Sequence, residues 1–207
     1  MAAVRIKLCG VRRPADALLC ARAGADEVGV VFAAGSKRRV TLEVARQIRD
    51  ALPREVPLVG VFQSASLEEL RAAVATLALA ALQLHGSVPV GAESLGLPLY
   101  AALQVTSAEA LAPLDALAPR FTRALLDGPR GGSGLSFAWE LGRAARARFA
   151  GEVFVAGGLH AGNVAQAIAA AAPDGVDVAS GIEGEDGFKD AARVNAFVAA
   201  VRGGRVS

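Results

Sequence analysis

Cysteine and histidine are scarce in this chain of 207 residues, which contains two of each. Cys9, Cys20, His85 and His160 are well separated along the sequence. They therefore lack the spacing of a metal-ligand cluster, and we expect no metal site.

An excess of charge of either sign is also missing, because 22 lysines and arginines face 20 aspartates and glutamates, for a net charge of +2. The arginines occur singly or in pairs with acids between them, which indicates a solvated surface rather than a patch for nucleic acid or an anionic membrane. We expect a small-molecule ligand, and neither a nucleic-acid nor a membrane partner.

Long apolar runs are absent as well. The N-terminus, MAAVRIK, passes into a strand-like run without a charged-then-apolar leader. The longest apolar stretches, such as residues 74–82, are far shorter than the roughly 20 residues that span a bilayer. We therefore expect a cytoplasmic protein in which Cys9 and Cys20 stay reduced.

Short apolar runs alternate with helical patterns along the chain. Near-continuously apolar runs between Gly, Pro or polar residues are typical of parallel strands covered on both faces. The expected strands are residues 4–9, 27–32, 57–62, 80–85, 98–105, 121–127, 152–156 and 175–179. The expected helices are residues 14–25, 41–52, 66–77, 136–149, 160–172 and 190–201, with weaker patterns at 88–95 and 107–117.

Eight strands, each followed by a helix, predict an α/β fold, a single (β/α)8 TIM barrel over residues 1–207. An open doubly wound sheet is the alternative. Such a sheet usually has fewer strands, and no G-x-G-x-x-G motif lies between the first strand and the first helix.

Active sites of such barrels lie on the loops that follow the C-terminal ends of the strands. The loops after the seventh and eighth strands commonly bind phosphate through backbone N–H groups. The polar or glycine-rich positions expected at these ends are Cys9, Arg38, His85, Asp127, Gly157–Gly158 and Ser180–Gly181.

Cys9, at the end of the first expected strand, is a candidate reactive residue. A lone cysteine is more often a small buried hydrophobe, but strand alternation places Lys7 and Cys9 together on the face toward the barrel axis. A neighbouring ammonium favours the thiolate. Lys7 itself needs a partner, for which we expect Asp177 on the adjacent eighth strand, although that pair is equally compatible with a purely structural role.

Asp127 is the candidate general acid, because a carboxyl at the tip of an apolar strand has a raised pKa. The alternative is that it only caps a turn before glycine. The glycine-rich loop at 128–134 is expected to act as a lid. Arg38 suits bidentate binding of a carboxylate, and His85 is expected to be a hydrogen-bonded structural group rather than a proton carrier.

Seven motifs of the chain resemble, in order, those of the phosphoribosylanthranilate isomerases: KLCGV, GSKR, VGVF, LQLHG, LLDGPRGGSGLSF, AGGL and GVDVASGIE. The resemblance runs from residue 6 to about residue 190. It implies a (β/α)8 enzyme of tryptophan biosynthesis that needs no cofactor. The implied reaction is the Amadori rearrangement of N-(5-phosphoribosyl)anthranilate to 1-(2-carboxyphenylamino)-1-deoxyribulose 5-phosphate.

The resemblance also implies a role for each site residue. Cys9 falls on the family's base and Asp127 on its acid. Arg38 falls on the arginine for the anthranilate carboxylate, and Gly157–Gly158 and Ser180–Gly181 fall on its phosphate loops. A monomer or a homodimer is expected. Departures from the family pattern fall at Ala33, Ala34, Ser64, Ala138 and Ala179.

Three other functions compete with this interpretation. The histidine-pathway Amadori isomerases resemble a two-aspartate barrel, so Cys9 argues against them. A ribulose-phosphate epimerase is disfavoured because a histidine–aspartate metal set is missing. A non-catalytic barrel that binds phosphate esters is the third alternative, since fold alone does not give function, and intact Cys9 and Asp127 argue against it.

Overall fold

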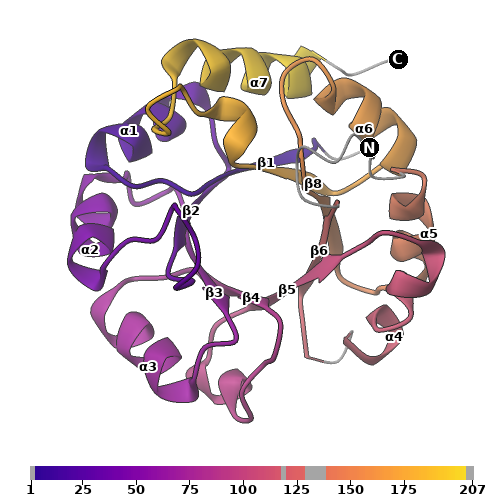
Figure 1. Ribbon diagram of the computed structural model, residues 1–207, viewed down its shortest axis with the longest axis horizontal. Coiled ribbons are helices and arrows are strands. Elements are labelled where there is room, and N and C mark those ends of the chain that lie inside the picture. Colours follow the sequence, from indigo (N-terminus) through magenta and orange to yellow (C-terminus); the bar gives the residue numbers. More distant parts are fainter. Residues whose placement is uncertain (1–2, 118–119, 129–138, 204–207) are drawn as a thin grey trace.

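The computed structural model describes residues 3–117, 120–128 and 139–203, and its centre is a closed barrel of parallel strands with helices around the outside (Figure 1). The strands are β1 Arg5–Cys9, β2 Glu27–Val31, β3 Leu58–Gln63, β4 Ala81–His85, β5 Leu99–Gln104, β6 Arg123–Asp127, β7 Glu152–Val155 and β8 Gly175–Val178. All eight predicted strands are confirmed. Because β1 pairs with β8, the sheet closes and the open-sheet alternative is wrong.

The helices are α1 Pro14–Ala23, α2 Leu42–Ala51, α3 Leu67–Thr76, α4 Leu114–Leu117, α5 Leu141–Arg148, α6 Val164–Ala171 and α7 Ala191–Gly203. Three short 3-10 helices complete the pattern: η1 Ala92–Leu95, η2 Ala108–Leu111 and η3 Ser180–Ile182. The two weak patterns, at 88–95 and 107–117, contain only η1, η2 and the four-residue α4. In the described residues, no helix is long and apolar enough to cross a membrane.

Local sequence signals set the helix ends. Pro14 opens α1, and Gly24 closes it in the left-handed conformation with φ of +95°. Ser66 and Glu69 form the predicted capping box of α3. Helix α6 begins four residues later than predicted, because the Asn163 side chain accepts a hydrogen bond from the His160 backbone and holds those residues in a turn.

The barrel interior is filled by side chains and is not a pore. Its middle layer contains Val59, Ala81, Tyr100, Leu125 and Phe154 from alternate positions of their strands. A larger apolar layer separates the strands from the surrounding helices. The middle of the barrel is therefore filled, and a ligand would have to bind at an end of the barrel or outside it.

A buried ion cluster closes the N-terminal end of the barrel. Arg123 is 1% exposed and donates hydrogen bonds to Glu27 at 2.7 and 2.8 Å and to Glu152 at 2.9 and 2.6 Å. Its guanidinium also lies between the rings of Tyr100 and Phe154, at 4.0 and 3.8 Å from their centroids. Every charged member is paired, which is the condition for placing such a cluster in a barrel interior.

Replacing Arg123 by methionine is expected to lower the free energy of unfolding by roughly 3 kcal/mol, because Glu27 is left buried without its main partner. This loss is at the lower end of the range for removing one partner of a buried ion pair, since Arg5 still contacts Glu27. Urea denaturation measures it. The double variant Arg123→Met/Glu27→Leu removes both buried charges and should regain most of the stability. A single variant as stable as the parent would contradict the assigned role.

Candidate active site

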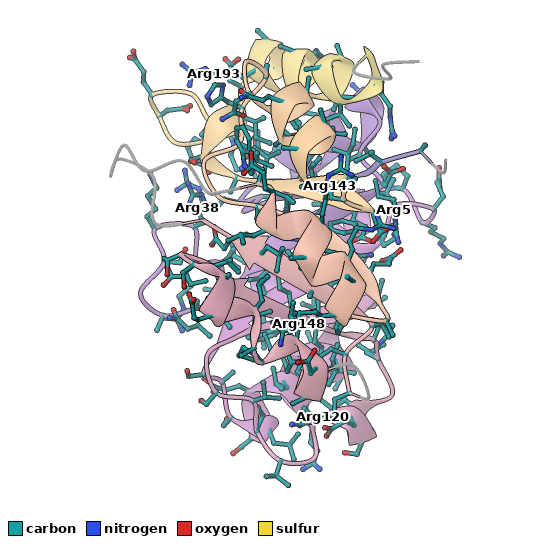
Figure 2. The ribbon with its side chains drawn as sticks, turned by 90° about the vertical axis from the view of Figure 1, so that its right-hand side faces the viewer. Arg5, Arg38, Arg120, Arg143, Arg148 and Arg193 are labelled. Atoms are coloured by element: carbon teal, nitrogen blue, oxygen red, sulfur yellow. The ribbon has the colours of Figure 1, made fainter. Side chains whose placement is uncertain are left out.

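One cavity of about 410 Å³ opens at the C-terminal end of the barrel, within the size range of small-molecule sites. Arg38 marks this end in the side view, and Arg5, in the ion cluster, marks the opposite end (Figure 2). The predicted site residues that line the cavity are Cys9, Arg38, His85, Asp127, Gly157, Gly158, Asp177 and Ser180. Residues remote in sequence are thus brought to one place.

Cys9 ends β1 and is 7% exposed, with its side chain at the floor of the cavity. Gly29 lies opposite on β2. A Cβ atom at Gly29 would lie 2.7 Å from the Cys9 Sγ and 3.3 Å from the Lys7 Nζ. Only glycine leaves the thiol and the ammonium room side by side, which is a requirement that the sequence did not disclose.

The predicted pair of Lys7 and Asp177 is confirmed. The two residues are directly opposite each other on β1 and β8, and the Lys7 Nζ donates a hydrogen bond of 2.9 Å to an Asp177 carboxylate oxygen. Burial is the largest single effect and lowers the pKa of Lys7, but the charge and hydrogen bond of Asp177 together with the charges of Cys9 and Glu27 outweigh it, and the net pKa is above the ordinary value. Lys7 therefore remains charged although it is fully buried.

The thiol of Cys9 responds to two opposing effects. Burial raises its pKa above the ordinary value, and the Lys7 ammonium lowers it by less. The predicted effect of Lys7 is present but smaller than the effect of burial. Cys9 is thus a neutral thiol in the resting protein and must lose its proton before it accepts another.

Asp127 ends β6 on the wall of the cavity. Burial, assisted by the negative charge of Asp177, raises the pKa of its carboxyl to about 6. Among the described residues, no side chain or backbone N–H donates a hydrogen bond to this carboxylate, and residues 129–138 that follow the turn are not among them. A carboxyl with this pKa holds a proton in a useful fraction of molecules near neutral pH.

The loops after β7 and β8 meet above the strands. Gly157 and Gly158 have φ of +78° and +65°, a conformation that favours glycine, and both line the cavity. Ser180 lines it too, at the start of the short helix η3. Gly181 does not line the cavity. A Cβ atom at Gly181 would be 1.9 Å from the Leu159 carbonyl oxygen, so glycine allows the loops after β7 and β8 to touch.

Arg38 lines the cavity but already has a partner. Its Nε and Nη2 donate hydrogen bonds of 2.5 and 2.8 Å to the two carboxylate oxygens of Glu183. The Lys189 Nζ donates to Glu183 Oε1, the oxygen that also accepts from the Arg38 Nε, at 3.2 Å. The sequence analysis missed both residues. The signal that could have found them is an acid inside the GVDVASGIE motif with a lysine six residues later.

His85 and Gln83 lie on neighbouring inward positions of β4. The His85 Nε2 is 2.9 Å from the Gln83 side-chain nitrogen. Burial, and then the charge of Lys7, lower the pKa of His85, so the imidazole is neutral. This hydrogen-bonded histidine agrees with the structural role predicted for it. Gln83, which also lines the cavity, was not predicted.

The departures from the family motifs fall in different surroundings. Ala33 and Ala179 line the cavity, and Ala34 is exposed. Ser64 has φ of +47°, a backbone conformation that is uncommon for residues other than glycine. Ala138 and residues 129–134 of the expected lid lie outside the described residues.

The sequence matches the family model of N-(5'phosphoribosyl)anthranilate (PRA) isomerase over residues 6–200. It is 42% identical over 207 residues to the N-(5'-phosphoribosyl)anthranilate isomerase of Stutzerimonas stutzeri, covering 98% of this chain and 99% of that relative.

Solved structures agree with this match. The phosphoribosyl anthranilate isomerase of Thermotoga maritima superposes with a TM-score of 0.89 and 35% identity, covering 97% of this chain and 99% of that one. A second solved phosphoribosyl anthranilate isomerase holds reduced 1-(o-carboxyphenylamino)-1-deoxyribulose 5-phosphate; it has a TM-score of 0.86 and 33% identity, with 97% and 99% covered. The likeness thus extends over nearly the whole chain.

Proposed function

Because the chain belongs to the family of N-(5'-phosphoribosyl)anthranilate isomerases, we propose that Cys9 is the general base and Asp127 the general acid of its reaction. The enzyme is an isomerase of tryptophan biosynthesis that acts on phosphoribosylanthranilate. The observation that supports the two roles best is that both side chains line one cavity, which the glycine loops after β7 and β8 also line.

The reaction begins with the protonated carboxyl of Asp127. It gives its proton to the furanose ring oxygen while the bond from C1′ to that oxygen breaks, and the anthranilate nitrogen supplies the electron pair that makes the open-chain iminium. The ring oxygen becomes the 4′-hydroxyl. Asp127 is then a carboxylate, and its negative charge helps to stabilise the cationic intermediate.

The second step uses the thiolate of Cys9. It removes the C2′ proton, whose electron pair forms the C1′–C2′ double bond while the iminium nitrogen becomes neutral. The resulting enolamine then moves a proton from the 2′-hydroxyl to C1′ and becomes the ketose. Cys9 then loses its proton to solvent and Asp127 takes one up, which restores the starting state. The Lys7 ammonium beside Cys9 stabilises the thiolate, and Asp177 holds that ammonium in place.

Two charged groups of the substrate orient it for these steps. We assign Arg38 to the anthranilate carboxylate. The phosphate is assigned to Gly157, Gly158 and Ser180, which line the cavity, with Gly181 behind them. Fixing both ends of the substrate brings C2′ and the ring oxygen to the two proton carriers and supplies the positioning on which such catalysis depends.

The pH dependence of kcat/KM follows from the two raised pKa values. The active form has Asp127 protonated and Cys9 ionised, the opposite of the form that predominates between the two pKa values. In that interval, the fraction of molecules with Asp127 protonated falls tenfold per pH unit, while the fraction with Cys9 ionised rises tenfold. The fraction of molecules in the active form is therefore constant. We expect kcat/KM to rise up to about pH 6 and then to stay level until the pKa of Cys9 is reached.

Initial rates with phosphoribosylanthranilate across this range test the expectation. A decrease that sets in directly above pH 6 would mean that Cys9 is already a thiolate there, against the effect of its burial. The variant Asp127→Asn should lack the bend near pH 6, and its kcat/KM should keep rising toward the pKa of Cys9, because only the thiol then titrates.

The loss of phosphoribosylanthranilate fluorescence on adding the purified protein, with the product identified by mass spectrometry and NMR, tests the function itself. Turnover of this substrate and none of the histidine-pathway substrate is the expected result. Tight binding of the product without turnover would favour the phosphate-ester-binding barrel. We further propose that the enzyme works in the cytoplasm, as a monomer or a homodimer that light scattering distinguishes.

A further inference from the structure

Arg38 is held on two sides before any ligand is bound. Its aliphatic part crosses over Gly10, where a Cβ atom would lie 2.4 Å from the Arg38 Cδ and where φ is +74°. Its guanidinium donates from Nε and Nη2 to both carboxylate oxygens of Glu183. The side chains of Glu183 and Arg38 are 5% and 19% exposed, so the carboxylate is buried, and the two parallel hydrogen bonds fix the geometry of the pair.

The contact with Glu183 leaves part of the guanidinium unused. A guanidinium has five N–H donors in a rigid plane, and Glu183 takes one from Nε and one from Nη2. Among the described residues, nothing accepts from Nη1 or from the second N–H of Nη2, and these donors lie along the adjacent edge. That edge is the one that matches a second carboxylate in a bidentate arrangement.

We infer that Glu183 is the positioning residue that aims Arg38 at the anthranilate carboxylate, an inference that rests on the function proposed above. Glu183 touches no reacting atom in this account. It fixes the plane of the guanidinium, so that the substrate carboxylate finds the free edge without the entropy loss of ordering a long side chain.

A carboxylate next to the binding site of another carboxylate needs its charge neutralised. Lys189 does this: its Nζ is 3.2 Å from a Glu183 oxygen, and its side chain is 1% exposed. Arg38 and Lys189 together carry two positive charges against the single negative charge of Glu183. One net positive charge therefore remains for the substrate.

The same cluster connects the two ends of the proposed substrate site. The Lys189 Nζ also donates to the Ala179 carbonyl oxygen at 3.0 Å, directly before Ser180 of the phosphate loop. Arg193, on the same end of the barrel as Arg38 in Figure 2, donates to the Glu183 backbone oxygen at 2.6 Å. The backbone of the loop after β8 thus has anchors besides the Glu183 side chain, whose carboxylate contacts both Arg38 and Lys189.

A double-mutant cycle tests this inference by steady-state kinetics with phosphoribosylanthranilate. Glu183→Ala is expected to raise KM about tenfold, within the range for coupled neighbours, with kcat little changed. In the background of Arg38→Met, the same replacement should have no further effect on KM. Glu183→Gln keeps an acceptor for one guanidinium N–H and should give an intermediate KM, which also covers the case that the alanine variant folds poorly.

Two controls separate positioning from a general disturbance of the loop. Glu185→Ala removes an exposed acid from the same loop and should leave KM unchanged. Ribose 5-phosphate lacks the carboxylate, so its inhibition constant should be the same for the parent and for Glu183→Gln. Two results would overturn the inference. One is that the Glu183 replacement raises KM equally in the parent and in Arg38→Met; the other is that Glu183→Gln weakens the binding of ribose 5-phosphate as much as it raises KM. In the same assay, turnover by the parent enzyme tests the proposed function, whereas the KM values of the variants test the role of Glu183.

Discussion

Cys9→Ala is expected to lower kcat by roughly 10²–10⁴-fold, the usual contribution of a positioned proton carrier. KM should change little, because the thiol is not assigned to either end of the substrate. The expectation rests on the place of Cys9 at the end of β1, on the floor of the cavity beside the Lys7 ammonium. The fluorescence assay for phosphoribosylanthranilate measures the loss directly.

Cys20→Ala is the matched control for this variant. Cys20 is fully buried in α1, between the helix and the barrel, and is not among the residues that line the cavity. Its replacement should cost about 1 kcal/mol of stability and leave kcat unchanged. If Cys9→Ala kept the activity of the Cys20 variant, the base would have to be another residue.

Asp127→Asn is expected to lower kcat by a similar factor, about 10²–10⁴-fold. Asparagine has nearly the same shape as aspartic acid but cannot give a proton to the ring oxygen, so the furanose of the bound substrate would open without general-acid assistance. Burial makes the effect larger than at a surface position, because it keeps a fraction of Asp127 protonated near neutral pH.

A surface carboxylate provides the control for this second variant. Asp115 on α4 pairs with Arg148 at 2.7 Å in an exposed position, and Asp115→Asn should leave kcat unchanged. Circular dichroism confirms that each variant is folded. Full activity of Asp127→Asn would remove Asp127 from the mechanism and would revive its interpretation as a turn residue.

Much of this architecture could be predicted from the sequence because the signals are local. The eight apolar runs between turn residues gave the strands, and alternation within residues 4–9 placed Lys7 and Cys9 on the inner face. The pairing of Lys7 with Asp177 followed from barrel closure, which makes the first and last strands neighbours. These predictions needed the order of the elements but no side-chain coordinates.

The parts that could not be predicted depend on contacts between loops. Nothing near Arg38 in the sequence indicates Glu183, since 145 residues separate them and only the closed barrel brings the loops after β2 and β8 together. The resting state of Cys9 depends on two opposing effects, burial and Lys7, whose balance requires the packed structure. The need for glycine at position 29 could not be predicted from the sequence, because it arises from the space that the Cys9 and Lys7 side chains occupy.

The division of work between Cys9 and Asp127 is tested most directly by the isotope effect of deuterium at C2′. In Cys9→Ser, removal of the C2′ proton should limit the rate, and the deuterated substrate should react several-fold more slowly. In Asp127→Asn, ring opening should limit the rate, and the isotope effect should vanish. Equal isotope effects in the two variants, or none in Cys9→Ser, would contradict the assignment of base and acid.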